Sequence, residues 1–208
     1  MSLGYFTLQG ECENTIVIER SKFICNMKCV ENEEDAKAFI ESIRKKHSLA
    51  NHNCYAYIAD DKGLIQKFSD DGEPQGTAGL PMLEVLKNKK LYKTVAVVTR
   101  YFGGIKLGTG RLTRAYSGSV TDCLKITKIV NMLSSKTFST TIEYDGYSKL
   151  LKVLSSEDIK ILNTEFENLV SITFAVKEEK VPLMLESINN AFNGKQEIFE
   201  KESGYSAF

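Results

Sequence analysis

The feature that most restricts how this chain can fold is a short apolar segment, residues 94–99, that runs into a glycine-rich loop. The segment reads Thr-Val-Ala-Val-Val-Thr, and an apolar run without alternation predicts a strand that is covered on both faces. Residues 100–114 follow at once and contain four glycines. Apolar residues then recur at helical spacing up to Cys123, which predicts a helix over about 109–127. The sequence therefore predicts a central strand, a tight loop and a helix in direct succession.

The remaining periodic segments predict an α+β fold with two domains, residues 1–132 and 136–208, and a boundary near 130–136. In the first domain, alternation predicts strands over 15–19, 23–30, 54–59 and 64–68, and helical spacing predicts helices over 33–47 and 81–90. In the second, strands over 138–144, 160–167, 169–177 and 196–201 and helices over 147–154 and 180–192 follow in the order βαββαβ. That order is the ferredoxin-like split pattern.

Bulk properties exclude several other classes of protein. The 208 residues suffice for two domains of about 100 residues each, and no apolar run approaches the ~18 residues of a membrane helix. The N-terminus lacks the basic-then-apolar layout of a secretory signal, so we expect a cytoplasmic protein without a membrane partner. The five cysteines show neither disulfide nor zinc spacing, and Cys25 and Cys29 are expected to be buried thiols.

Charge is distributed unevenly along a chain whose net charge is zero. Residues 87–128 hold ten Lys/Arg and one acid, whereas residues 1–86 hold nine Lys/Arg and fourteen acids. Residues 129–208 are again acidic, with eight basic and twelve acidic side chains. Positive charge that is concentrated in the middle of a neutral chain indicates a local anion-binding site.

The glycine-rich loop is the first candidate for that site. Backbone N–H groups at the start of a helix attract anions, and glycines allow a phosphate to approach closely. Arg111 and Arg114 lie in the first turns of the predicted helix, where each opposes the helix dipole by about 0.3–1 kcal/mol. A bound phosphate or carboxylate would remove that conflict. The candidate ligand-binding residues are Arg100, Gly103, Gly104, Lys106, Gly108, Thr109, Gly110, Arg111 and Arg114.

An alternative interpretation of the same loop is purely structural. The glycines would then only permit a tight turn, and the arginines would pair with Asp70, Asp71 or Glu73. The loop is not a Walker motif, because no Lys-Ser/Thr pair follows its second glycine, and it does not match a dinucleotide fingerprint. Anion binding is the favoured interpretation, and the structural one stays open.

The acidic segment 69–79 is a candidate second wall of the same pocket. Its three carboxylates within four residues could bind Mg²⁺ or pair with the arginines, and a capped, solvated turn is favoured over a metal site. His52 is expected to be a polar member of the pocket rather than a catalytic partner of Cys54, because no third orienting group is identifiable. The candidate residues of this wall are His52, Asp70, Asp71, Glu73, Thr77 and Gly79. We assign no catalytic residue, no metal ligand and no cofactor from the sequence.

Four segments together resemble the signature of the YigZ/IMPACT family. Two are short: residues 19–23 (Glu-Arg-Ser-Lys-Phe) and 52–56 (His-Asn-Cys-Tyr-Ala). Two are long and ungapped: residues 69–81 (Ser-Asp-Asp-Gly-Glu-Pro-Gln-Gly-Thr-Ala-Gly-Leu-Pro) and 97–108 (Val-Val-Thr-Arg-Tyr-Phe-Gly-Gly-Ile-Lys-Leu-Gly). The likeness covers nearly the whole chain. The resemblance implies an N-terminal domain like the second domain of ribosomal protein S5 and a ferredoxin-like C-terminal domain similar to domain V of elongation factor G.

The resemblance implies no agreed catalytic activity. Nucleic-acid or ribosome-related binding has been inferred for the family from its domain likeness. Eukaryotic IMPACT proteins regulate translation through an additional N-terminal partner-binding domain, and the length of this chain leaves no room for it, so that role is not expected to carry over. Some relatives carry a proline dipeptidase label, but the sequence shows no His/Asp/Glu set for a two-metal peptidase.

Three functions follow from the sequence and the resemblance. The favoured one is a protein that binds RNA or a ribosome-related partner, with a part in translation regulation. Its phosphate contacts would be Arg100, Lys106, Arg111 and Arg114, extended by Lys87, Lys89, Lys90 and Lys93. The second is an enzyme or sensor for a small phosphorylated metabolite, bound between the loops 69–79 and 103–110. The third is a protein-interaction module that uses the ferredoxin-like sheet. The sequence leaves the oligomeric state open.

Overall fold

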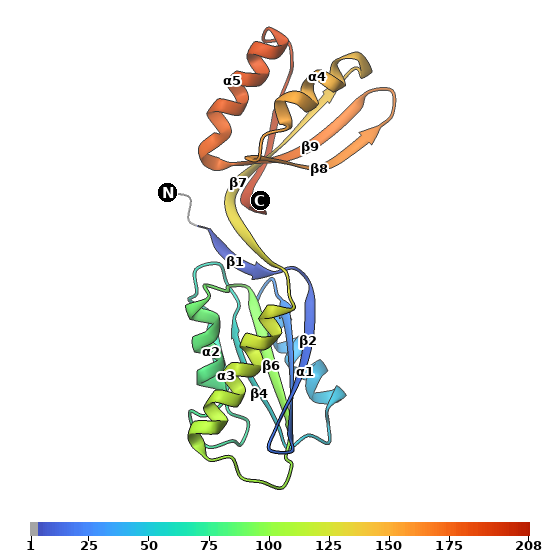
Figure 1. The fold of residues 1–208 in the computed structure, drawn as a ribbon. Helices are drawn as coiled ribbons and strands as arrows, with labels where there is room; N and C mark the ends of the chain where they lie inside the picture. The colour runs from blue at the N-terminus through green and yellow to red at the C-terminus, as the bar shows by residue number, and fades with distance from the viewer. Residues whose placement is uncertain (1–3) are drawn as a thin grey trace. The chain divides into compact units, whose positions relative to one another are not determined.

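The computed structural model describes residues 4–208, and its helices and strands are labelled in Figure 1. The described chain divides into two compact units. The N-terminal unit is Tyr5–Val130, and the C-terminal unit is Asn131–Phe208 together with Gly4. The division falls within one continuous strand, β7 (Ile129–Ile142), rather than in a loop. Each unit mixes helices and strands around its own hydrophobic core, which confirms the predicted α+β class.

The N-terminal unit is built around β6 (Thr94–Tyr101), the apolar strand that the sequence predicts at the centre of a sheet. The strand order is β2-β3-β6-β4-β5, and every neighbouring pair is antiparallel. The other strands are β2 (Glu11–Ile18), β3 (Ser21–Cys29), β4 (His52–Ile58) and β5 (Gln66–Ser69). Every β6 residue before Tyr101 is buried, so the prediction of a central strand is confirmed.

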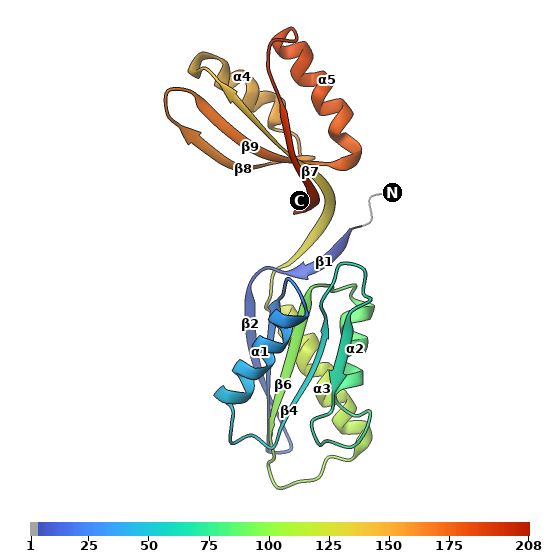
Figure 2. The same ribbon diagram turned by 180° about the vertical axis from the view of Figure 1, so that it is seen from behind.

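Helices cover both faces of this sheet, which is why β6 is apolar on both sides. α1 (Glu33–Lys46) lies on one face, and α2 (Gly79–Asn88) and α3 (Thr109–Lys125) lie on the other (Figures 1 and 2). Val95 and Val97 belong to the core under α1, whereas Ala96 and Val98 belong to the core under α2 and α3. Burial of one such valine stabilises the fold by about 1.5–3 kcal/mol, so both helical layers are anchored on β6.

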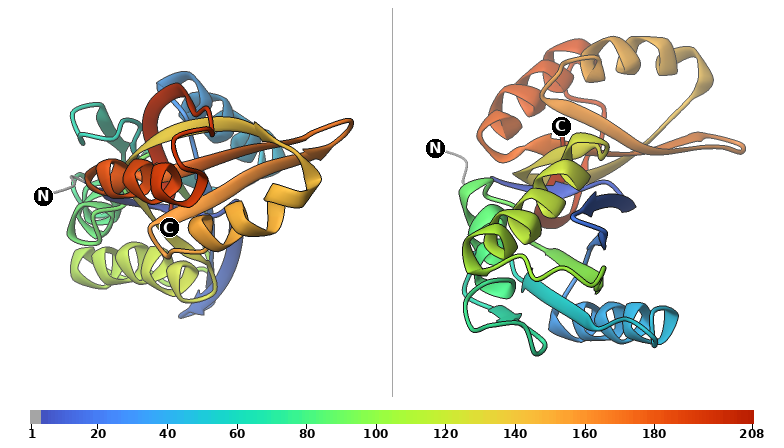
Figure 3. Two further views of the ribbon diagram at one scale, coloured as in Figure 1. Left: turned by 90° about the horizontal axis from the view of Figure 1, so that it is seen from above. Right: turned by 60° about the horizontal axis from the view of Figure 1, so that its bottom comes forward.

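The C-terminal unit has the element order βαββαβ that the sequence predicts. Its strands are β7, β8 (Ile159–Phe166), β9 (Val170–Lys177) and β10 (Phe199–Ala207), and its helices are α4 (Tyr144–Leu154), α5 (Val181–Phe192) and a short 3₁₀ turn at Glu178–Lys180. Antiparallel pairing gives the order β10-β7-β9-β8. α4 and α5 lie on one face of this sheet (Figures 1 and 3) and enclose a core around Phe138 and Phe174. No helix within residues 4–208 is long and apolar enough to cross a membrane.

Three segments differ most from the expectation, and β2, β5 and α2 are shifted at their ends by up to four residues. β1 (Tyr5–Leu8) is a strand that periodicity does not predict, because four residues are too few for a pattern. β7 begins at Ile129 rather than at 138, and β10 ends at Ala207 rather than at 201. Residues 134–137 of β7 and 202–206 of β10 are mostly polar and pair with each other, as Ser135 does with Gly204. Pairing between strands, not an apolar face, makes these portions strands.

Candidate functional site

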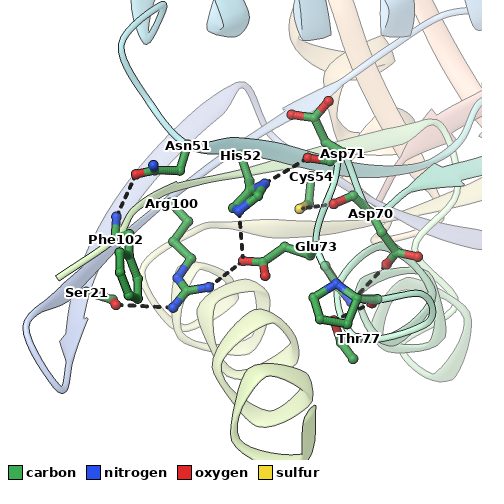
Figure 4. A network of polar contacts seen from close by, with 12 residues as sticks. Ser21, Asn51, His52, Cys54, Asp70, Asp71, Glu73, Thr77, Arg100 and Phe102 are labelled. Atoms are coloured by element: carbon green, nitrogen blue, oxygen red, sulfur yellow. Dashed lines mark hydrogen bonds and ion pairs between the residues drawn. The ribbon is translucent and has the colours of Figure 1, made fainter. Parts of the chain in front are cut away.

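Segments from four parts of the sequence meet at one end of the N-terminal sheet. β3 and β4 flank β6 in antiparallel register, which places Phe23 and His52 opposite Arg100. Ser21 at the β2–β3 turn and Glu73 in the loop 69–79 both contact Arg100. Residues that are far apart in the sequence therefore form one polar network, which Figure 4 shows from close by.

Arg100 lies at the centre of this network and is buried, with 5% of its surface exposed. Its Nη1 donates to Glu73 Oε1 at 2.7 Å, and its Nη2 donates to Ser21 Oγ at 3.3 Å. The Tyr116 hydroxyl donates to the same Glu73 oxygen at 2.8 Å, and burial raises the pKa of Tyr116, which keeps that proton in place. Arg100 therefore fits the structural interpretation of the loop, in which the arginines pair with acids of segment 69–79. Its side chain pairs with Glu73 and does not face solvent.

Asp70 supplies the anion at the start of α2. Its carboxylate accepts the backbone N–H groups of Gly76, Ala78 and Gly79 at 2.8, 3.0 and 2.8 Å. The Thr77 hydroxyl donates to a carbonyl oxygen of the same loop at 2.6 Å. Carboxylates are favourable at helix starts because they satisfy free N–H groups and meet the positive end of the dipole. Thr77 and Gly79, two candidate residues of the second wall, therefore use these donors inside the loop.

Asp71 binds the first two residues of β4, His52 and Asn53. One carboxylate oxygen of Asp71 accepts the Asn53 N–H at 2.6 Å, and the other lies 3.5 Å from Arg44 Nη2. His52 Nδ1 lies 2.9 Å from the Asp71 carbonyl oxygen, so Nδ1 is the protonated nitrogen. Its Nε2 then faces Glu73 Oε1 at 3.9 Å. His52 is thus a polar member of the network, and it joins β4 to the acidic loop through Asp71 and Glu73.

The buried thiol of Cys54 donates to the Asp70 carbonyl oxygen at 3.0 Å. Burial raises the pKa of this thiol, which keeps it protonated and a poor nucleophile. The carboxylates of Asp70, Asp71 and Glu73 point to three different sets of partners. Within residues 4–208 no group of three or more His, Cys, Asp or Glu side chains is arranged to hold a metal ion.

The glycines between β6 and α3 have different roles. A Cβ at Gly103 would lie 2.1 Å from the carbonyl carbon of Arg20, so this glycine lets the loop pack against the β2–β3 turn. Gly108, with φ of 71°, is the residue that precedes α3. The Cβ positions of Gly104 and Gly110 face open space. Close packing explains Gly103, whereas the glycines nearer to α3 leave the start of that helix unobstructed.

The cations of the loop are exposed, apart from Arg100, and their pairing differs. Arg111 forms an ion pair with Glu19 of the β2–β3 turn. The side chains of Lys106 and Arg114 form no hydrogen bond or ion pair with any group in the described range 4–208. No side chain caps the first turn of α3, which begins at Thr109. Exposed cations and an open helix start therefore occur together on this side of the unit.

Arg20 and Lys22 are two further exposed cations, which sequence reasoning did not assign to the site. They flank Ser21 at the β2–β3 turn, and neither side chain has a partner in the described part of the chain. Arg20 and its neighbour Glu19 have φ of 66° and 43°, a left-handed conformation that costs non-glycine residues about 1–3 kcal/mol each. The sequence does contain a signal for these two cations, because both belong to the segment 19–23 of the family signature.

The lysines that were expected to extend the surface lie elsewhere, which corrects that expectation. Lys87, Lys89, Lys90 and Lys93 precede β6, whereas the glycine-rich loop follows it. The eight residues of β6 separate the two ends by roughly 26 Å. Lys87 and Lys93 are also paired with neighbouring carboxylates. A second basic cluster therefore lies at the opposite end of the sheet.

The fold and the site define a two-unit α+β protein with a buried polar network beneath an exposed basic loop. The sequence profile of the Impact N-terminal domain matches residues 19–124, and that of a domain of unknown function, DUF1949, matches residues 140–195. The chain belongs to the IMPACT family, which confirms the resemblance seen in the four signature segments.

Relatives match this chain over most of its length. IMPACT family member YvyE of Bacillus subtilis is 42% identical over 97% of this chain and 93% of its own. IMPACT family member YigZ of Escherichia coli is 38% identical over 79% of this chain and 81% of its own. A crystal structure described as that of a hypothetical protein is 32% identical, with a TM-score of 0.62 and coverage of 97% and 98%. Protein IMPACT of Xenopus laevis is 30% identical over 62% of this chain but only 39% of its own.

Proposed function

We propose that this protein binds RNA, free or as part of the ribosome, and that it acts in translation regulation in the cytoplasm. The binding surface is the tip surface, by which we mean the exposed side chains at the network end of the N-terminal unit. They are Arg20, Lys22, Phe102, Lys106, Arg111 and Arg114. The observation that carries the proposal is that Lys106 and Arg114 are exposed beside the open start of α3, and that neither side chain has a partner in residues 4–208.

The charges near this surface explain why it should attract phosphate. Cations at a helix start oppose the dipole by about 0.3–1 kcal/mol each. The carboxylates of the adjacent loop do not neutralise them, because Glu73 binds Arg100 and Asp70 binds the start of α2. Phosphate groups from outside the chain would remove this repulsion and accept charge-assisted hydrogen bonds. Cations that are spread over a turn, a loop and a helix suit the repeated phosphates of a polymer.

The test is binding of a structured RNA at several salt concentrations, measured by fluorescence anisotropy. We expect affinity to fall steeply between 50 and 200 mM salt, as it does when lysines and arginines displace counterions from phosphates. The double variant Lys106→Gln/Arg114→Gln should bind more weakly and should reduce the slope of log K against log salt by about 0.7–0.9 for each phosphate that the variant no longer neutralises.

Lys89→Gln/Lys90→Gln is the matched control, because it removes the same charge at the opposite end of β6. Both lysines are exposed, and neither side chain has a partner within residues 4–208. The control should leave RNA affinity close to that of the wild type. Equal losses in the two double variants would show that only net charge matters, and absence of RNA binding at low salt would contradict the proposal.

Two other functions are less well supported. A small phosphorylated metabolite between the loops 69–79 and 103–110 would compete with Asp70 and Glu73 for their donors. Stabilisation by nucleotides in a thermal-shift screen, with and without Mg²⁺, would favour it. We assign the C-terminal unit to the ferredoxin-like fold from its element order, and its sheet is the surface that a protein-interaction module would use. Nuclease-resistant capture of a partner would favour that function.

A further inference from the structure

Phe102 is an exposed aromatic residue in a fixed position on the tip surface. Phe102 directly follows β6, and 44% of the residue's surface is accessible to solvent. The Phe102 N–H donates to Asn51 Oδ1 at 2.8 Å, which holds the backbone (Figure 4). The Arg100 guanidinium lies 5.4 Å from the ring centroid. Phe102 is therefore anchored at its backbone and by a cation against its ring, and much of its side chain still faces solvent.

The cation next to Phe102 is itself held by hydrogen bonds. Arg100 is held by Glu73 and Ser21 through hydrogen bonds, and it lies at 5.4 Å from the centroid of Phe23 as well. A guanidinium that is fixed in this way orients the ring that it contacts. The aromatic ring of Phe102 is consequently a part of this network that reaches the protein surface.

Two direct contacts join the segments that carry Phe102 and the exposed cations of the tip surface. The Gly103 N–H donates to Ser21 Oγ at 3.2 Å, which attaches the Phe102 loop to the turn that carries Arg20 and Lys22. The ion pair of Arg111 with Glu19 attaches α3 to the same turn. Cations that contact the backbone, combined with an aromatic ring that accepts a base, are the means by which proteins bind single strands.

We propose that Phe102 stacks on an unpaired base, so that the RNA recognised at the tip surface is single-stranded there. This inference rests on the proposed function, because it requires RNA at that surface. Bases in a duplex are already stacked on their neighbours and are not presented to a side chain, whereas bases in loops and single strands are. The cations then bind the phosphates on either side of the stacked base, and Arg100 serves as a positioning residue behind the ring.

The absence of tryptophan from the sequence makes a direct test available, because Phe102→Trp adds a single fluorescent reporter at the stacking position. We expect an oligoadenylate to quench this tryptophan and to bind with an affinity close to that for the wild type. Phe102→Leu should weaken oligoadenylate binding by about 5- to 150-fold, the usual effect of removing a stacking ring. Inorganic polyphosphate, which has phosphates but no bases, should bind wild type and Phe102→Leu equally well.

Phe166→Leu is the control variant, since Phe166 is an exposed phenylalanine of the C-terminal unit at 58% accessibility. If Phe102→Leu and Phe166→Leu affect oligoadenylate binding equally, or if RNA leaves the tryptophan unquenched, stacking is wrong while the proposed function stands. Tighter binding of duplex than of single-stranded RNA would also overturn the stacking proposal, and the proposed function would still stand. If the wild type binds no RNA at low salt, both proposals fail.

Discussion

Arg100 and Glu73 form an ion pair that water scarcely reaches, with 6% and 3% of their side chains exposed. Burial of two charges is costly, and only good geometry together with additional hydrogen bonds offsets that cost. Ser21 and Tyr116 supply those bonds. Each partner is therefore stabilising only while the other is present, which makes this pair the most sensitive point of the network.

Removal of one partner should expose this dependence. Arg100→Met leaves the Glu73 carboxylate buried without its cation, and we expect a loss of about 3–5 kcal/mol in unfolding free energy, measured by urea denaturation. Arg111→Met removes an exposed ion pair with Glu19 and should change stability by less than about 1 kcal/mol. The double variant Arg100→Met/Glu73→Leu should regain part of the loss. A similar effect of Arg100→Met and Arg111→Met would contradict the buried pair.

His47, directly after the end of α1, is a residue whose contribution to stability depends on pH. Its Nδ1 lies 3.0 Å from the Tyr101 hydroxyl oxygen, and its Nε2 is buried without a partner. Burial, and then the neighbouring charge of Lys46, lowers the pKa of His47 below its usual 6.5, while Glu13 opposes the shift. The folded protein thus favours neutral His47, and the unfolded chain takes up the proton first as the pH falls.

The sign of this shift gives a prediction for pH dependence. The contribution of neutral His47 to stability is present above about pH 6.5 and is lost as the pH falls through that value and below. The wild-type melting temperature should therefore fall between pH 7.5 and pH 5.5. His47→Gln, which does not titrate, should show a smaller fall over the same interval. Parallel melting curves of the two proteins against pH would show that His47 is not buried as described.

At the scale of elements, the loop between β6 and α3 differs from the loop 69–79 in its contacts. Its first glycine packs on the backbone of the β2–β3 turn, and its last, Gly108, precedes an uncapped helix. The loop 69–79 is different, because Asp70 caps α2 from within the chain. Of the two helix starts at this end of the sheet, that of α2 binds the carboxylate of Asp70, whereas no side chain caps that of α3. That difference is why we place the proposed ligand at α3.

Two glycine substitutions separate packing from open space in this segment. Gly103→Ala would force a Cβ against the Arg20 backbone, so we expect a loss of about 1–3 kcal/mol, as for other overpacked sites. Gly110→Ala lies in the first turn of α3 with no atom near its Cβ, so we expect a gain of up to about 1 kcal/mol from helix propensity. Thermal and urea unfolding measure both. A gain of stability in both variants would mean that the loop relaxes away from the turn.

At the scale of the whole molecule, the two units have separate hydrophobic cores. The cores around α1, α2 and α3 contain only residues of Tyr5–Val130, and the core around α4 and α5 contains only residues of the C-terminal unit. A unit of more than 100 residues with its own core is large enough to fold alone. The tip surface lies entirely within the N-terminal unit.

Residues 5–130 expressed alone should therefore fold and bind RNA. We expect a cooperative thermal transition by circular dichroism and an RNA affinity within a few-fold of that of the whole chain, since all the proposed phosphate contacts are retained. The excised C-terminal unit, residues 131–208, serves as the comparison and should bind more weakly. A fragment 5–130 that folds but does not bind would move the RNA-binding surface to the C-terminal unit.

Local patterns in the sequence predict much of this protein. The apolar run of β6, the helical spacing of α1 and α3 and the βαββαβ order of the C-terminal unit depend on neighbouring residues, and all are found in the structure. The four signature segments likewise identify the family. β1, the added ends of β7 and β10 and the place of the cations Arg20 and Lys22 at the site were not predicted. The strand portions are defined by pairing with distant residues, and the two cations reach the site only through the packing of the β2–β3 turn.

Only the tertiary structure decides which charges are used internally. Every acid and base of the site is visible in the sequence, but their pairing depends on strand register and on loops that meet from distant positions. That meeting directs Glu73 to Arg100 and Asp70 to the start of α2, and it leaves Lys106 and Arg114 exposed. Ion pairs form over a few ångströms, whereas the partners here lie 27 residues apart in the chain. The composition of the site is therefore a property of the sequence, and its free charges are a property of the fold.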